Sequence, residues 1–260
     1  MNMLLAVCGK GGVGKTTVSA IGARALSRLP GRSLVIDADP SGGLALALGI
    51  EPPRTLNDVR KEIIGEIKAR ARDEKDLAVS IDYLVSEALA ERGNLAFLAI
   101  GRPEDVGCYC KVNVILKDAI RGLGGLFDRV LIDAEAGIEQ VNRKVMGSVD
   151  FLLLVSDTSA KAVKVAETIK EVARTMVSGE GSGLLVNRVR DVSEAERVRA
   201  STALGVLGSV PEDDTVREYD AGLLPFFELP DCPASIAVEA ALEKAGFLER
   251  GGAAPGGPAR

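Results

Sequence analysis

A glycine-rich stretch near the amino terminus has the residue types and spacing that bind phosphate. Residues 8–17 read CGKGGVGKTT and fit the pattern G-x-x-x-x-G-K-[ST] from Gly9 to Thr16. Glycines let the backbone curl so that its N–H groups point at phosphate oxygens, and a helix that begins after the loop adds positive potential. We expect Lys15 to reach the terminal phosphates and the Thr16 hydroxyl to hold Mg²⁺. The expected nucleotide-binding residues of the loop are Gly9, Gly11, Gly12, Val13, Gly14, Lys15, Thr16 and Thr17.

Aspartates end two apolar runs of strand length. The stretch VIDADPSGG (35–43) contains Asp37 and Asp39, and VLIDAEAG (130–137) ends its apolar part with Asp133. A carboxylate just past a strand can orient a water molecule for attack on a γ-phosphate. An aspartate at the end of such a strand can make a second contact to Mg²⁺, often through water, and we expect Asp133 in this role. The alternative is that each aspartate only caps a turn at the end of its strand.

Two thiols lie one residue apart in GRPEDVGCYC (101–110), which precedes an apolar helical pattern. A helix N-terminus lowers the pKa of a thiol and favours the thiolate, which is the metal-binding form. Cys108 and Cys110 alone fill half of a tetrahedral site, and a two-fold dimer would supply the other half. Four thiolates suit Zn²⁺ in a tetrahedron, and Ni²⁺ or Cu⁺ in other geometries. The alternative is that both are small hydrophobic side chains at a helix cap.

Apolar runs of strand length alternate with longer helical patterns along the chain. Most runs are apolar throughout, as in strands that are covered on both faces. This pattern predicts a single-domain α/β three-layer sandwich of the P-loop NTPase type, with a mostly parallel twisted sheet and helices on both faces. Strands are expected at 3–7, 33–37, 95–100, 129–133, 150–156, 183–187 and 204–211, with a shorter candidate at 82–88. Helices are expected at 15–28, 56–72, 112–121, 160–176, 193–203 and 235–248.

Composition narrows the range of partners. The chain has 260 residues, a formal net charge of −5, four cysteines and no histidine. Without a basic excess or a polybasic run we expect no nucleic-acid or membrane partner. No apolar stretch approaches the roughly 20 residues that span a bilayer, and the start lacks the features of a signal peptide. We therefore expect a cytoplasmic, reduced protein, with Cys8 in the core and no role assigned to Cys232.

The early lysine of the loop adds a resemblance. With Lys10 in GKGGVGKTT, the loop resembles the deviant phosphate loop of the MinD/ParA/nitrogenase-iron-protein class of ATPases. This resemblance implies that Lys10 reaches across a homodimer to the partner's nucleotide, and that Asp39 orients the attacking water. The implied catalytic residues are then Lys10, Lys15 and Asp39. We expect the ATPase domain to cover residues 1–250 and the Gly/Pro-rich residues 251–260 to form a disordered tail.

The segment LVNRVRD (185–191) favours adenine over guanine. GTPases commonly read guanine with the aspartate of an N-K-x-D pattern, and here Asn187 is present but Arg190 stands where that aspartate would be. VPEDDTVREYD (210–220) resembles the loop that holds adenine in the same class through backbone groups near Pro211 and Glu212. ATP with Mg²⁺ is therefore the expected nucleotide, with Asn187, Pro211 and Glu212 around the base.

Three segments together resemble the CooC-type nickel-insertion ATPases of carbon monoxide dehydrogenase maturation. They are the phosphate loop, GRPEDVGCYC, and LIDAEAGIEQVNR (131–143), and the likeness spans most of residues 1–225. It implies an ATP-dependent metallochaperone that binds Ni²⁺ or Zn²⁺ between two subunits through Cys108 and Cys110. ATP hydrolysis would control the dimer and metal release, and the client would be carbon monoxide dehydrogenase or acetyl-CoA synthase. Gln140 stands where some members are expected to have histidine.

Two other functions of the same class remain open. A MinD/ParA-like spatial regulator is one, although the ending RGGAAPGGPAR cannot form the amphipathic membrane helix of MinD, and the chain lacks the basic surface that ParA uses for DNA. An iron–sulfur electron-transfer ATPase is the other. It would hold a cluster with two cysteines per chain, one near each switch-facing turn, and DAEAGIEQVNRKVMG (133–147) has none. The alternative is that Cys108 and Cys110 on a single turn hold the cluster instead.

Overall fold

The computed structural model describes residues 3–68, 74–102, 110–134, 149–174 and 181–248. Over these residues the chain forms one eight-stranded sheet with strand order β3-β4-β2-β5-β1-β6-β7-β8. β3 runs antiparallel to β4, and all other neighbours are parallel. The strands are β1 (Met3–Gly9), β2 (Ser33–Asp37), β3 (Ala90–Arg92), β4 (Leu95–Ala99), β5 (Arg129–Asp133), β6 (Phe151–Ser156), β7 (Ser182–Val189) and β8 (Val206–Pro211).

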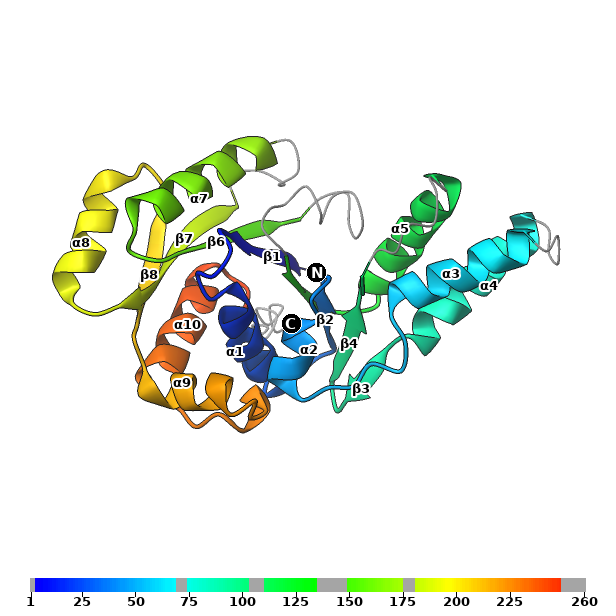
Figure 1. Ribbon diagram of the computed structural model, residues 1–260, viewed down its shortest axis with the longest axis horizontal. Coiled ribbons are helices and arrows are strands. Elements are labelled where there is room, and N and C mark those ends of the chain that lie inside the picture. The colour runs from blue at the N-terminus through cyan, green and yellow to red at the C-terminus, as the bar shows by residue number, and fades with distance from the viewer. Residues whose placement is uncertain (1–2, 69–73, 103–109, 135–148, 175–180, 249–260) are drawn as a thin grey trace, which may run out of the picture.

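Helices cover both faces of the sheet (Figure 1). On one face lie α1 (Lys15–Ser27), α2 (Gly43–Leu48), α9 (Asp214–Ala221), the short 3₁₀ helix η1 (Phe226–Glu228) and α10 (Pro233–Lys244). On the other face lie α3 (Leu56–Lys68), α4 (Glu74–Glu87), α5 (Cys110–Gly124), α7 (Ala160–Ala173) and α8 (Val192–Ser201). The predicted three-layer α/β architecture is thereby confirmed. None of the helices in the described ranges is long and apolar enough to cross a membrane.

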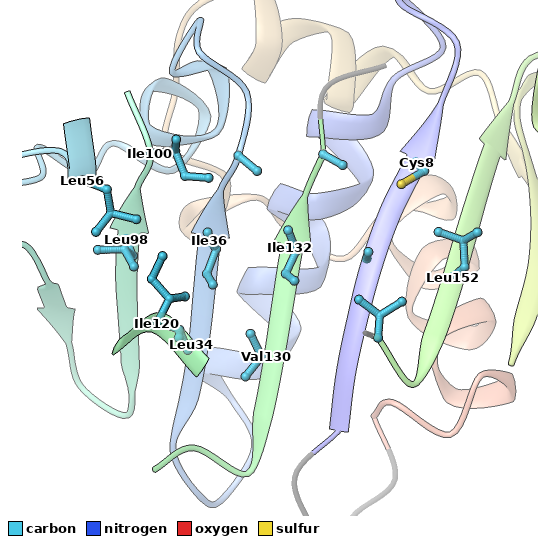
Figure 2. Close-up of a cluster of buried hydrophobic side chains, with 14 of the residues drawn as sticks. Cys8, Leu34, Ile36, Leu56, Leu98, Ile100, Ile120, Val130, Ile132 and Leu152 are labelled. Carbon is cyan, nitrogen blue, oxygen red and sulfur yellow. The ribbon is translucent and has the colours of Figure 1, made fainter. Parts of the chain in front are cut away.

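The two faces of the sheet have separate hydrophobic cores, because successive strand side chains point to opposite faces. In β5, Val130 and Ile132 belong to the core under α3, α4, α5, α7 and α8, which Figure 2 shows, whereas Leu131 belongs to the core under α1 and α10. By the same alternation, Asp133 points toward the α1 face. Asp37 pairs with Asp133 across β2 and β5, so the two carboxylates share that face.

Some expected elements differ from the observed ones. Residues 82–88 are not a strand: residues 82–87 form the end of α4, and Ala88 follows the helix in a turn. Ile81, Leu84, Val85 and Ala88 are buried at helical rather than alternating spacing. The expected helix over 56–72 corresponds to α3, which covers Leu56–Lys68, and the remaining residues 69–72 lie outside the described ranges. The segment 210–220, expected as the loop that holds the base, is only partly a loop, because Asp214–Ala221 forms α9. The Asp213 side chain caps this helix by accepting from the backbone N–H groups of its first turn.

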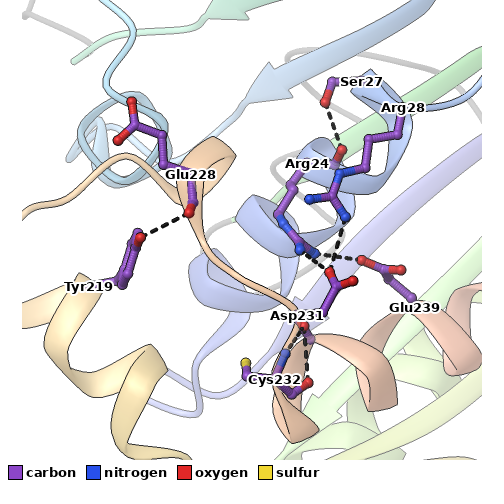
Figure 3. A network of polar contacts seen from close by, with 9 residues as sticks. Arg24, Ser27, Arg28, Tyr219, Glu228, Asp231, Cys232 and Glu239 are labelled. Atoms are coloured by element: carbon purple, nitrogen blue, oxygen red, sulfur yellow. Dashed lines mark hydrogen bonds and ion pairs between the residues drawn. The ribbon is translucent and has the colours of Figure 1, made fainter.

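A buried arginine joins α1 to α10 (Figure 3). The Arg24 side chain is fully buried, forms an ion pair with Asp231, and donates from Nη1 to Glu239 Oε1 at 2.8 Å. Both acids are partly exposed, so solvent reaches them but does not reach the guanidinium. Removing the acids would therefore leave an unpaired buried charge, whereas removing the arginine would leave carboxylates that water can solvate.

This asymmetry predicts an order of stabilities. The double variant Asp231→Ala/Glu239→Ala should lose about 3 kcal/mol or more of the free energy of unfolding, because it leaves a buried cation unpaired. Arg24→Met should lower the free energy of unfolding by at least about 1 kcal/mol less than the double variant does. Urea denaturation measures both. Arg28→Met is the control, since Arg28 is exposed and pairs with the same Asp231 at 3.2 Å. If Arg24→Met is the more damaging change, the pairing account is wrong.

Candidate nucleotide site

The glycine-rich loop joins the end of β1 to the start of α1. Gly12 and Gly14 have φ angles of 83° and 91°, which other residues rarely adopt, and Gly14 is the N-cap of α1. The side chain of Lys15 is buried and folds back over the loop, with Nζ donating to the carbonyl of Lys10 at 3.3 Å. The loop thus has the curled form and the positive centre that a phosphate group requires.

Asp133 lies directly beneath this loop. Its Oδ2 accepts from the Thr16 hydroxyl at 2.9 Å, and its Oδ1 accepts from the Ser19 hydroxyl at 2.9 Å. Burial and, to a smaller extent, the neighbouring Asp37 raise the pKa of the Asp133 carboxyl to about 7, against the lowering effect of the two hydroxyl hydrogen bonds and of Lys15. The end of β5 is therefore tied to the first turn of α1 by a carboxyl group that titrates near neutral pH.

Asp37 organises the segment that follows β2. Its carboxylate accepts from the backbone N–H groups of Asp39 at 3.1 Å, Leu44 at 3.1 Å and Ala45 at 3.3 Å. The last two belong to the first turn of α2, so Asp37 anchors the start of this helix. Burial raises the pKa of Asp37 to about 6. Asp39 is half-exposed beside it, and its predicted role in orienting water stays a prediction.

The oxygen groups here suit a hard divalent cation. Magnesium prefers oxygen ligands and binds through one or two protein groups together with substrate phosphates and water. The Thr16 hydroxyl and the Asp133 carboxylate are in contact below the loop, with Asp37 on the adjacent strand, so they fit such an ion. In the described part of the chain, no group of three or more His, Cys, Asp or Glu side chains could hold a metal by itself.

A pocket of about 460 Å³ opens beside the loop. Thr17 from α1, Asn187 from β7, and Pro211 and Glu212 at the end of β8 all line it. The structure thus brings together the residues that the sequence placed around the base. Asn187 is also engaged elsewhere, since its Nδ2 donates to the carbonyl of Val13 at 2.9 Å. Contact of these residues with adenine stays a prediction.

The cysteines are only partly described. Cys108 lies outside the described residues, and Cys110 is the first residue of α5, with its side chain not described. Cys8 is buried in the core, as expected, and burial raises the pKa of its thiol to about 12. Cys232 is the buried N-cap of α10. Residues 135–143, which carry part of the metallochaperone resemblance, also lie outside the described ranges, as does the predicted tail.

Three residues with evident structural roles at the site escaped the sequence analysis. Ser19 follows Thr16 by three positions, so helical spacing could have placed it on the same face of α1. Asp213 accepts from Ala234 N at 3.0 Å as well as from α9, and thus joins both helices at the rim of the pocket. Arg188 has no sequence signal at all, because its position depends on an irregularity in β7.

The fold and the phosphate loop together define a P-loop nucleotide-binding protein. A family model described as the CobQ/CobB/MinD/ParA nucleotide binding domain matches residues 4–226. The chain therefore belongs to this family, and it is an ATPase of the MinD/ParA type.

Individual relatives of this chain are named for different functions. An uncharacterized ATP-binding protein of Methanocaldococcus jannaschii is 35% identical over 88% of this chain and 92% of its own length. The carbon monoxide dehydrogenase accessory protein CooC of Rhodospirillum rubrum is 28% identical over 94% of this chain and 98% of its own length. The septum site-determining protein MinD of Bacillus subtilis is 29% identical over 88% of this chain and 83% of its own length. MinD of Pyrococcus horikoshii, solved with Mg-ADP, shares the fold, with a TM-score of 0.68 at 21% identity over 96% of this chain and all of that one.

The raised pKa of Asp133 predicts a pH-dependent stability. Because the folded state holds a proton on Asp133 up to about pH 7 and the unfolded chain releases it near its ordinary pKa of about 4, the folded protein loses stability as the pH rises through this window. Asp133→Asn abolishes this loss. Without nucleotide or Mg²⁺, the variant's stability relative to wild type should increase by at least about 1 kcal/mol between pH 5 and pH 8.

Urea denaturation at both pH values measures the effect. Asp82→Asn, an exposed change of the same kind on α4, is the control and should give the same difference from wild type at each pH. An Asp133→Asn variant whose relative stability is independent of pH would contradict the assignment of a buried, protonatable carboxyl at this position.

Proposed function

We propose that the protein is an ATP-dependent metallochaperone of the CooC type. It binds a metal ion between two copies of the chain and assists nickel insertion into carbon monoxide dehydrogenase or acetyl-CoA synthase. The observation that carries this proposal is the likeness to CooC across nearly the whole length of both chains, together with the Cys-Tyr-Cys triplet at residues 108–110. ATP hydrolysis controls the dimer and the release of the metal.

The nucleotide half of the proposal uses the loop and the two strand ends beside it. The backbone N–H groups of residues 9–17 surround the phosphates, and Lys15 neutralises their charge. The Thr16 hydroxyl and Asp133 would hold Mg²⁺, which supplies charge neutralisation on the phosphate oxygens. Asp39 orients the attacking water, and Lys10 extends to the nucleotide of the partner copy. The base occupies the pocket lined by Asn187, Pro211 and Glu212.

The thiols of the proposed metal site lie in the sequence at or just before the N-terminus of α5. This helix packs against α3 and α4, and Cys110 is its first residue. The chain reaches it from β4, and Ile100, directly after that strand, donates from its N–H to the carbonyl of Asp37 at 2.9 Å. Asp37 in turn anchors α2 at the nucleotide site. This contact supports the proposal that the segment after Asp37 and the chain leading from β4 to Cys110 respond together to the nucleotide.

A dimer completes the metal site in this proposal. Each copy supplies Cys108 and Cys110, and a two-fold axis through the site brings four thiolates around one ion. Nucleotide-dependent movement of the segment after Asp37 would then alter the geometry or the access of the ion. Order and disorder of such segments with nucleotide state is an established mode of switching in related proteins.

A MinD-like spatial regulator is the second candidate, because MinD proteins match the sequence and the fold. The two candidates differ in their ligands. A regulator of this kind would bind a membrane surface or DNA when ATP is present, and it would need no thiol-bound metal.

The two thiols provide the test of the first candidate. Anaerobically purified protein should bind one Ni²⁺ or Zn²⁺ ion for every two chains, measured by elemental analysis and by the mass in solution. The double variant Cys108→Ala/Cys110→Ala should lose this ion, because no thiolate remains at the proposed site. Cys232→Ala, which removes a buried thiol elsewhere, is the control and should keep it.

Unchanged metal content in the double variant would refute the metal site. ATP-dependent sedimentation of the wild-type chain with liposomes or DNA would favour the regulator instead. Brown colour with visible absorption in the anaerobic protein would indicate an iron–sulfur cluster rather than a nickel or zinc ion.

A further inference from the structure

The strand β7 contains a bulge at the edge of the nucleotide site. Val186 pairs with Ser209 of β8, but Val189 pairs with Pro211, so β7 has one more residue than β8 over this interval. The interval contains Asn187 and Arg188, and Arg188 has a φ angle of 57°. A non-glycine residue rarely adopts this left-handed conformation, and bulges next to binding sites commonly redirect side chains. The irregularity therefore calls for a structural reason.

The bulge aims two consecutive side chains at the phosphate loop. Asn187 Nδ2 donates to the carbonyl of Val13 at 2.9 Å, and Arg188 Nη1 donates to the carbonyl of Gly12 at 3.0 Å. The amide of Asn187 is itself fixed by the N–H of Arg188, which donates to its Oδ1 at 3.0 Å. The contact is close, because a Cβ atom on Gly14 would lie 2.3 Å from Asn187 Nδ2 and 4.0 Å from Arg188 Nε.

These contacts restrict the direction of two peptide groups in the loop. A phosphate loop works by pointing its N–H groups inward, and each carbonyl held on the outer side keeps the adjoining N–H available for the ligand. Arg188 is exposed, so hydrophobic burial does not explain its conformation. Its side chain also lines the 460 Å³ pocket beside the loop, so it contacts both parts of the site.

We propose that Arg188 is a positioning residue that holds the Gly12–Val13 peptide in the orientation that binds phosphate. This inference rests on the proposed nucleotide site, and it assigns a role to a residue in the bulge of β7. With this left-handed backbone, the guanidinium of Arg188 lies within hydrogen-bond distance of the Gly12 carbonyl. Loss of the guanidinium should then affect phosphate binding more than folding.

Arg188→Gly tests this separation of effects. Glycine adopts the left-handed conformation freely, so the unfolding midpoint in urea should stay the same or rise. Affinity for Mg·ADP should fall by about 3- to 10-fold, the range expected for the loss of one ordinary intramolecular hydrogen bond. Affinity for Mg·pyrophosphate should fall by the same factor, because the loop holds only the phosphates. Arg188→Lys should restore part of the loss in both cases.

Calorimetric titration of each ligand gives the affinities, and Arg197→Ala on α8 is the control for loss of an exposed arginine charge. Equal binding of both ligands by Arg188→Gly and wild type would overturn the proposal. So would a loss confined to Mg·ADP, which would place Arg188 at the base alone, or a loss of affinity that accompanies a lower unfolding midpoint. If wild type binds neither ligand, the nucleotide site itself is contradicted, not only the role of Arg188.

Discussion

The hydrogen bonds from Thr16 and Ser19 to the buried carboxyl of Asp133 are the contact on which the rest of the site depends. They join the end of a central strand to the first turn of the helix that follows the phosphate loop, and so fix the loop from below. A buried carboxylate is costly without compensation, and both hydroxyl groups supply part of it. A cation beside the same oxygens would supply the rest, which relates the stability of this part of the protein to its ligand.

The sheet makes this arrangement possible. Because β2 and β5 are adjacent and in register, the alternation of side chains places Asp37 and Asp133 on one face, beneath α1. Asp37 then anchors α2, while its own carbonyl accepts from the N–H of Ile100, the residue directly after β4. The sheet thus links the phosphate loop, the segment after β2, and the strand that leads toward the thiols. In the proposed function, this connection allows the state of the nucleotide to reach the metal.

Much of the fold and of the phosphate site could be predicted from sequence, because these features depend on residues that are close together in the chain. The phosphate loop, the apolar strands and the strand-end position of Asp133 all follow from local patterns, and the structure places them as expected. The strand expected at 82–88 was wrong because a short apolar run does not distinguish a strand from one face of a helix. The role of Arg188 could not be predicted, because it depends on the pairing register between β7 and β8. The thiol pair stays a prediction.

Calorimetric titration of the nucleotide-free chain with ADP, with and without Mg²⁺, measures how much the cation at Thr16 and Asp133 contributes to nucleotide binding. We expect one binding site per chain and an affinity at least about 10-fold higher with Mg²⁺, equivalent to about 1.4 kcal/mol, because Thr16 and Asp133 hold the ion against the phosphates. An affinity that is the same in EDTA as in Mg²⁺ would contradict the claim that these two side chains form the cation site beneath the loop.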